Sequence, residues 1–166
     1  GRITGLRKRR LRALLANDIS LIAYHLPLDA HAELGNNAQL GLRLGLVADA
    51  RFGEQELGFA GAAMLTLDAL AQRVQVALAR APLVLPGDGR ALKRIGWCTG
   101  GAQGYFESAI AAGVDAFITG EVSEPQAHLA RETGVAFLAC GHHATERFGA
   151  PAVAAHVAER FGVEHR

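Results

Sequence analysis

The 166-residue chain has few cysteines, almost no excess of charge and no long apolar run. Its two cysteines, Cys98 and Cys140, lie far apart without a CxxC motif, which favours free thiols in a reducing compartment such as the cytoplasm. The longest apolar runs fall far short of the ~20 residues that a membrane helix needs, so no membrane-spanning helix is expected. No signal peptide is expected either, because a mixed helix, and not an apolar stretch, follows the basic residues at the start.

The charge balance argues against polyanionic partners. Seventeen Lys and Arg residues oppose 16 Asp and Glu residues, which leaves a formal net charge of +1. A bulk charge this small does not recruit nucleic acid or an anionic membrane surface. The basic cluster from Arg7 to Arg12 is therefore predicted to be a solvated helix face, with phosphate binding as the less favoured alternative.

What the chain does contain is typical of a globular domain. Half of the residues are apolar, 20% are charged and 20 residues are glycine, which excludes a disordered, collagen-like or coiled-coil chain. The length is enough for one ordinary domain and little more. We therefore expect residues 1–166 to form a single domain.

The first half of the sequence predicts a mixture of helices and short strands. Apolar residues at helical spacing predict helices over 4–17, 37–44 and 66–80. The apolar run ISLIAYHL, residues 19–26, predicts a buried strand whose pairing ends at Pro27, because proline has no N–H to donate. A short strand is expected over 83–85. Residues 45–66 give only a weak signal for a strand or loop around residues 57–60.

From residue 94 the pattern becomes regular. Strands predicted over 94–98, 115–119 and 135–140 alternate with helices predicted over 103–113, 124–133 and 150–161. Strands that alternate with helices through short glycine-containing turns indicate βαβ units with parallel strands. The expected fold class is therefore α/β, with a mixed, largely parallel sheet flanked by helices.

Polar side chains gather in the loops that follow the predicted strands. These loops are residues 25–31, 98–101, 119–121 and 140–147, and they contain His, Asp, Glu and Cys. Because parallel α/β sheets place their sites beyond the carboxyl ends of the strands, we expect the four loops to meet at one edge of the sheet. This convergence, more than any single residue, indicates a functional site.

The sharpest single signal is GHHATER, residues 141–147. If a helix begins near His142, its imidazole and the carboxylate of Glu146 lie one turn apart on the same face. An imidazole and a carboxylate at this spacing suit half of a first-row divalent metal site, and Asp29 is a candidate third ligand. The alternative is that a histidine caps the helix and that Glu146 pairs with Arg147 in solvent.

Two other loops have both a chemical and a structural explanation. The backbone N–H groups of TGGAQG, residues 99–104, can hold an anion, or the glycines only permit a tight turn. The turn is not GxGxxG and has no acidic ribose partner, so a dinucleotide site is not expected. Glu121 can act as a general base or orient a ligand, or it can simply favour a helix N-terminus.

The remaining histidines and the cysteines are expected to be structural when each is taken alone. His25 and His31 flank Asp29, and each is more often a hydrogen-bonded structural histidine than a ligand. The two cysteines are expected to be small buried residues at strand ends, because they lack the spacing of metal-binding thiols.

Three stretches closely resemble the NIF-three-like family, the GTP cyclohydrolase I type 2 homologues that include the bacterial YbgI-like proteins. They are AYHLPLDAHAELGNNAQL, WCTGGAQGYFESAIAAGVDAFITGEVSE and GHHATERFG. The resemblance covers residues from about 2 to about 162. It implies a NIF-three-like fold, a dinuclear site for ions such as iron, zinc or manganese, and a hexameric ring built as a trimer of dimers.

By motif position, the resemblance identifies Asp29, His142 and Glu146 as metal ligands. The family's His-His-Gly motif before the basic helix and its Asn-Pro-rich C-terminal stretch are not found in these 166 residues. The resemblance therefore implies that the chain corresponds to the C-terminal two-thirds of such a protein and has about half of the ligand set. The large middle insertion of some relatives is also absent, as in the short forms of the family.

The leading functional expectation is a metal-dependent hydrolase. Two divalent ions would activate a shared water, and Glu121 or His25 would accept its proton. The expected substrate is a small molecule, with a nucleotide suggested only by the family name. One alternative is a non-enzymatic, ring-forming module that binds metal or a partner. A third, in which the helix with Arg7–Arg12 contacts nucleic acid, is disfavoured by the small net charge.

Overall fold

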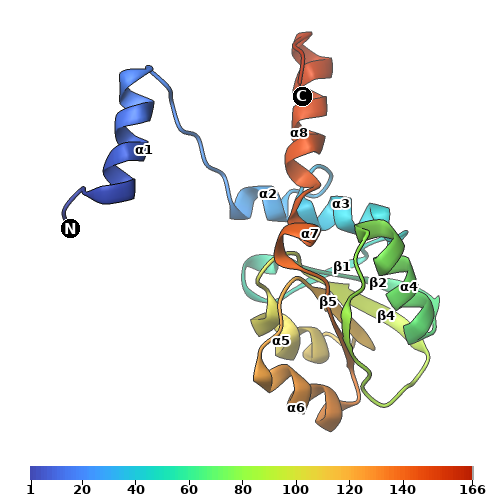
Figure 1. Ribbon diagram of the computed structural model, residues 1–166. Coiled ribbons are helices and arrows are strands. Elements are labelled where there is room, and N and C mark those ends of the chain that lie inside the picture. Colours follow the sequence, from blue (N-terminus) through green and yellow to red (C-terminus); the bar gives the residue numbers. More distant parts are fainter. Residues whose placement is uncertain (166) are drawn as a thin grey trace.

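A six-stranded sheet forms the centre of the computed structural model, which describes residues 1–165 (Figure 1). Its strands are β1 (Ala50–Phe52), β2 (Gly58–Leu65), β3 (Leu83–Leu85), β4 (Leu92–Trp97), β5 (Ala116–Thr119) and β6 (Ala136–Ala139). They follow one another across the sheet in the order β1-β2-β4-β5-β6-β3. The predicted strand over 83–85 and the three predicted strands after residue 94 are all present. β2 is longer than the sequence predicted, and β1 was not predicted.

Parallel pairing is confined to three neighbouring strands. β4 pairs in parallel with β5, and β5 pairs in parallel with β6. β2 is antiparallel to both β1 and β4, and β3 is antiparallel to β6. The predicted α/β class with a mixed sheet flanked by helices is confirmed. The sheet is parallel only over β4, β5 and β6, the region where strands and helices alternate in the sequence, and not over most of its pairings as predicted.

All six helices that the sequence predicted are present, α7 lies where the GHHATER argument placed a helix, and α2 was not predicted. The helices are α1 (Gly5–Ala16), α2 (Leu26–Ala30), α3 (Asn36–Arg43), α4 (Leu67–Leu78), α5 (Phe106–Ala111), α6 (Glu124–Thr133), α7 (His142–Glu146) and α8 (Gly149–Phe161). Two 3₁₀ turns, η1 (Glu54–Glu56) and η2 (Gln103–Tyr105), complete the chain, and η2 takes the first turn of the helix predicted over 103–113. No helix within residues 1–165 is long and apolar enough to cross a membrane.

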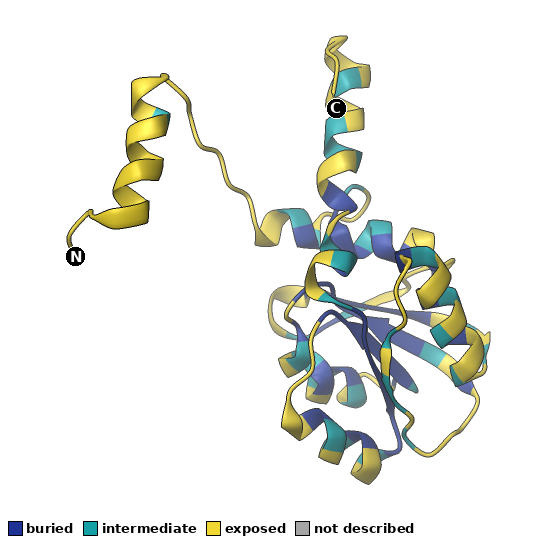
Figure 2. Ribbon diagram, viewed as in Figure 1, coloured by how far each residue is buried: buried dark blue, intermediate teal, exposed yellow. Residues whose placement is uncertain are grey.

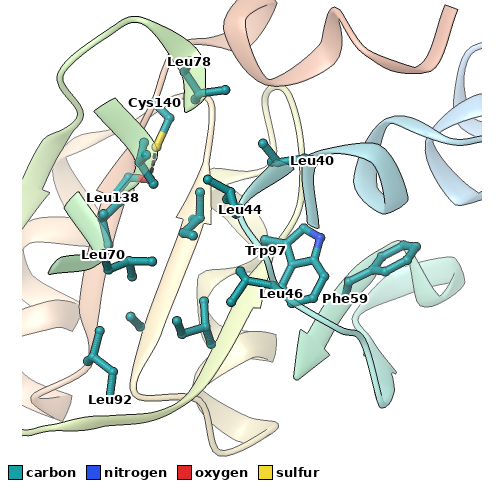
Figure 3. Packing of buried hydrophobic residues seen from close by; sticks show 14 of the residues in the cluster. Leu40, Leu44, Leu46, Phe59, Leu70, Leu78, Leu92, Trp97, Leu138 and Cys140 are labelled. Carbon is teal, nitrogen blue, oxygen red and sulfur yellow. Dashed lines mark hydrogen bonds between the residues drawn. The ribbon is translucent and has the colours of Figure 1, made fainter. Parts of the chain in front are cut away.

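The two faces of the sheet carry separate apolar cores, and Figure 2 shows that the central strands are buried. One core, drawn in Figure 3, packs Leu40 of α3 and Leu70 of α4 against Trp97 of β4. The other packs Phe106 of α5 against Phe137 of β6, with their ring centroids 4.9 Å apart. Side chains alternate between the two cores because successive residues of a strand point to opposite faces.

The prediction of a buried strand over residues 19–26 is wrong. Residues 19–24 form an exposed linker between α1 and α2, and helix α2 already begins at Leu26 (Figure 1). Pro27 therefore lies in the first turn of a helix, where its missing N–H costs nothing and its fixed φ is suitable. Within residues 1–165 the apolar run pairs with no strand, so the burial that its composition predicted is not observed among these residues.

Candidate metal centre

A pocket of about 330 Å³ lies where α2, the loop after β4 and α7 meet. The polar side chains that line it include His25, Asp29, His142 and Glu146. The predicted metal ligands from the LPLDAH and GHHATER motifs therefore border one pocket. Asp29 reaches it from helix α2, and not from the end of a strand as the sequence predicted.

Three of these residues bring one ligand atom each within 4.8 Å of one another, namely His25, Asp29 and Glu146. The distance from His25 Nε2 to Asp29 Oδ2 is 3.8 Å. His142 stands beside this group, with its Nε2 3.0 Å from Glu146 Oε2. An imidazole and two carboxylates this close together, with a second imidazole in contact, form a suitable donor set for a divalent first-row metal.

Helix geometry explains both close pairs. His25 and Asp29, like His142 and Glu146, are four residues apart, and this spacing places side chains on one face of a helix. α7 begins at His142, as the sequence argument required. The structural alternative, in which Glu146 pairs with Arg147, does not occur, because Arg147 instead donates to the carbonyl oxygen of Leu78.

A buried asparagine orients the Asp29 carboxylate. Asn36 Nδ2 donates to Asp29 Oδ1 at 2.8 Å, and Asn36 Oδ1 accepts from the backbone N–H of Gly149 at 2.8 Å. Because the amide oxygen is held by Gly149, the nitrogen must face Asp29. This hydrogen bond fixes Asp29 Oδ1, while Asp29 Oδ2 faces His25.

Asn37, the fully buried neighbour of Asn36, joins three walls of the pocket. Asn37 Nδ2 donates to the carbonyl oxygens of Asp29 and Leu57. Asn37 Oδ1 accepts from the backbone N–H of Thr99 at 2.8 Å. A single side chain thus ties α2 to the start of β2 and to the loop after β4. The sequence analysis gave these two residues no role in the site, although both lie in the stretch AYHLPLDAHAELGNNAQL, which carries part of the family resemblance.

The loop after β4 is held against α7. The backbone N–H of Gly100 donates to Thr145 Oγ1 at 2.9 Å. Gly100 has φ +73°, and a Cβ at this position would collide with the carboxylate of Glu146. The glycine is therefore needed for a turn and for close approach to a candidate ligand. Because the N–H groups of Thr99 and Gly100 already donate within the protein, the tight-turn explanation of TGGAQG fits the geometry.

Glu121 supports His142 from the side opposite Glu146. Its Oε1 lies 2.6 Å from His142 Nδ1. This hydrogen bond lowers the pKa of Glu121 below its usual value and raises the pKa of His142 above its usual value. Glu121 lines a separate hollow, which Arg80 also lines. A carboxylate on one imidazole nitrogen fixes the ring and directs the other nitrogen to the pocket.

The remaining candidate residues, His31 and the two cysteines, lie in surroundings that indicate a structural role. His31 Nδ1 accepts from the backbone N–H groups of Glu33 and Leu34, as expected for a structural histidine. Cys98 and Cys140 are free and buried, as predicted. Burial, reinforced for Cys98 by the charge of Asp29, raises the pKa of both thiols to about 12. Both thiols are therefore neutral near pH 7.

Curated relatives match almost the whole chain. A protein of Neisseria meningitidis serogroup B is 53% identical over 98% of the chain, and one of Pseudomonas aeruginosa is 50% identical over 98%. Both are named GTP cyclohydrolase 1 type 2 homolog. The chain spans about two thirds, 66%, of the length of each.

Solved structures show the same arrangement of the chain. The protein ybgI, described as of unknown function, is 45% identical with a TM-score of 0.91 over 98% of this chain and 66% of its own. TTHA1606 from Thermus thermophilus is 34% identical, with a TM-score of 0.85 over 100% of this chain and 69% of its own. The family model for Duf34/NIF3 (NGG1p interacting factor 3) matches residues 2–166. The chain therefore belongs to the Duf34/NIF3 family.

Proposed function

We propose that the pocket binds divalent metal ions and that the protein uses them to hydrolyse a small molecule. The single observation that carries this proposal is the group of His25, Asp29 and Glu146, whose ligand atoms lie within 4.8 Å of one another. Family membership supports it, since the metal ligands implied by the resemblance border the same pocket as this group.

The donor set fits a metal ion. Asp29 is 7% exposed, and its carboxylate is directed by Asn36 toward the pocket. Nitrogen and carboxylate oxygen ligands suit zinc, iron or manganese, and they do not select one of them. Asp29, Glu146 and His142 would hold the ions. The family resemblance implies a site for two ions. Bound there, divalent ions lower the pKa of a water molecule and polarise the bond to be cleaved.

The protein's own groups take distinct roles in this proposal. Asn36 holds the Asp29 carboxylate, and Glu121 holds the His142 ring with Nε2 toward Glu146. We assign the role of proton acceptor to His25 and not to Glu121, because Glu121 is occupied by His142 and lies outside the pocket. The His25 side chain is 75% exposed, so it can exchange its proton with solvent.

The substrate is proposed only by chemical class. The relatives' name mentions GTP, which makes a nucleotide one candidate. Among the described residues that line the pocket there is no Lys or Arg to pair with a polyphosphate. The pocket wall formed by Leu26, Leu57 and Tyr105 instead suits the uncharged part of a small organic molecule.

Metal content tests the site. Purified protein would be loaded with zinc or manganese, desalted and measured by elemental analysis, alongside Asp29→Ala and His142→Ala. We expect both substitutions to reduce the bound metal at least tenfold. The control is His128→Ala, which removes an exposed imidazole from α6, away from the pocket, and should leave the metal content unchanged. Unchanged metal in Asp29→Ala and His142→Ala would contradict the assignment.

A metal-binding or partner-binding module without enzymatic activity is the second candidate. The exposed apolar side chains of the linker before α2, such as Leu21 at 77% exposure, favour a role in association. Assays of nucleotide hydrolysis with and without added metal separate the two functions. Metal-dependent turnover that is lost in His25→Ala, while metal stays bound, would favour the hydrolase. The mass of the protein in solution tests the hexameric ring that the resemblance implies.

A further inference from the structure

The hollow that both Arg80 and Glu121 line has a volume of about 500 Å³, and we name it the Arg80 hollow. Its wall is formed by the segment between α4 and β3, the start of β3 and the loops that follow β5 and β6. It adjoins the metal pocket, because Glu121 in its wall is hydrogen-bonded to His142 in the wall of the pocket. A group bound in this hollow would therefore lie next to the candidate metal ligands.

Two unusual backbone positions place Arg80 in this wall. α4 ends at Leu78, and the next residue, Ala79, has a left-handed φ of +52°, which residues with a side chain rarely adopt. Arg80 then lies against Gly141, where a Cβ would come within 3.2 Å of its Nε. Figure 3 shows Leu78 and Cys140 in the same apolar core, which holds the end of α4 beside the loop after β6. The position of the guanidinium is therefore set by the fold.

The charge of Arg80 has no partner in the part of the chain that the structure describes. Within residues 1–165, no carboxylate oxygen lies within 4.0 Å of its guanidinium. Other arginines of the molecule are engaged: Arg90 and Arg94 pair with aspartates, and Arg73 and Arg147 donate to backbone carbonyl oxygens. Arg80 is thus available to a negative charge from outside the chain.

The loop after β5 adds further hydrogen-bond donors to the hollow. The backbone N–H groups of Glu121 and Val122 have no acceptor within residues 1–165. The Glu121 carboxylate does not compete for Arg80, because Oε1 is hydrogen-bonded to His142 and Oε2 lies 3.4 Å from Gln103 Nε2. A planar guanidinium can bind a carboxylate or a phosphate through two parallel hydrogen bonds. The hollow therefore has the donors that an oxyanion needs.

We propose that the Arg80 hollow binds the carboxylate or phosphate group of a small molecule, with the Arg80 guanidinium as its main partner. The lining of the metal pocket contains no Lys or Arg among the described residues, and Arg80 supplies a positive charge in the adjoining cavity. The inference goes beyond the proposed hydrolysis and needs no metal ion. It can therefore hold or fail independently of the proposed function.

NMR titration of the isotope-labelled 166-residue chain tests the site. The protein is first freed of metal on a chelating resin, and the ionic strength is held constant with sodium chloride. Sodium phosphate and sodium acetate are then titrated separately. We expect saturable shifts of the amide signals of Glu121, Val122 and Gly141 with one common dissociation constant. Saturation by only one of the two anions would assign the site to that oxyanion, and saturation by both would assign it to carboxylates and phosphates alike.

Two matched variants locate the contact. Arg80→Gln removes the guanidinium charge and should weaken anion binding at least tenfold. Because Arg80 is exposed and has no ion pair within the described residues, the variant should fold normally, as circular dichroism would verify. Arg131→Gln is the control, since Arg131 is an exposed arginine of α6 that does not line the hollow. It should leave the dissociation constant unchanged.

Three results would overturn the proposal. The first is the absence of saturable shifts with either anion. The second is a set of shifts centred on the basic helix with Arg7–Arg12, because the anion would then bind there and not in the hollow. The third is an equal effect of Arg80→Gln and Arg131→Gln, which would indicate a general effect of net charge.

Discussion

Apolar patterns of the same kind have different outcomes in two regions of the molecule, the body, residues 26–165, and the N-terminal arm. In the body, apolar residues at positions such as Ile95 and Ile118 alternate along strands and are fully buried. In the arm, residues 1–25, the apolar stretch ISLIAYH, residues 19–25, is exposed. An apolar pattern thus predicts that a segment is suited to pack against another part of the protein. It does not predict which part, because that depends on the tertiary structure.

The same contrast explains the stability of each region. The body has two apolar cores on opposite faces of its sheet, and its central strands pair on both sides. The arm has one helix, α1, without a single buried residue. We therefore expect the free energy of unfolding to depend on the body and to be almost independent of the arm.

The largest expected effect tests this difference directly. Phe117→Ala removes a fully buried ring that packs against Phe106 and Phe137, and it should lower the free energy of unfolding by about 3–5 kcal/mol. Tyr24→Ala removes an aromatic ring from the arm and should change it by less than about 0.5 kcal/mol. Urea denaturation measures both. A loss above 2 kcal/mol in Tyr24→Ala would contradict the contrast.

Two asparagines test the same difference between body and arm through hydrogen bonds instead of apolar contacts. Asn37→Ala leaves the buried N–H of Thr99 without its partner and should cost about 2–3 kcal/mol of stability. Asn17→Ala removes one exposed bond to the carbonyl oxygen of Ala13 in the arm and should cost less than about 0.5 kcal/mol. Equal effects in thermal or urea unfolding would show that Asn37 does not join the pocket walls.

The orientation of a candidate ligand gives the next effect. Asn36→Ala removes the donor that fixes Asp29 Oδ1, and loss of such a supporting contact typically weakens metal affinity 10–100-fold. Gln39→Ala on the same helix is the control, since its side chain donates only to the carbonyl oxygen of Glu33. Zinc titration with a competing chelator measures both affinities. The prediction is wrong if Asn36→Ala binds zinc as tightly as Gln39→Ala.

The smallest expected effect concerns protonation. The pKa of His142 is raised by its hydrogen bond with Glu121, so Glu121→Gln should lower it toward the ordinary value. NMR titration of the imidazole in metal-free protein measures the change. The pair is charged on both partners between the lowered pKa of Glu121 and the raised pKa of His142. Its stabilising effect is therefore lost as pH rises through the pKa of His142 or falls through that of Glu121.

The sequence predicted local features better than their assembly. GHHATER placed His142 and Glu146 one helical turn apart, which α7 confirms, because that spacing depends only on the helix. The roles of Asn36 and Asn37 could not be predicted, since their partners Gly149 and Thr99 are 113 and 62 residues further along the chain. Such contacts are set by the packing of α3 against the sheet and α8, which no local pattern encodes.

The placement of Asp29 shows the same limit. Sequence reasoning expected it after a strand, and the structure has it on helix α2, yet it reaches the expected pocket. His25 was expected to be structural when taken alone, and it lies within the group of candidate ligands because α2 brings it to the same side as Asp29. Residue types therefore predicted which side chains border one pocket, while the elements that carry them required the fold.

The most direct test of the central claim is anomalous X-ray diffraction from crystals of the chain grown with zinc or manganese. The account predicts an anomalous peak within bonding distance of Asp29 and Glu146, with His142 completing the coordination. A peak elsewhere on the surface, with the side chains of this pocket unchanged and free of metal, would contradict the account.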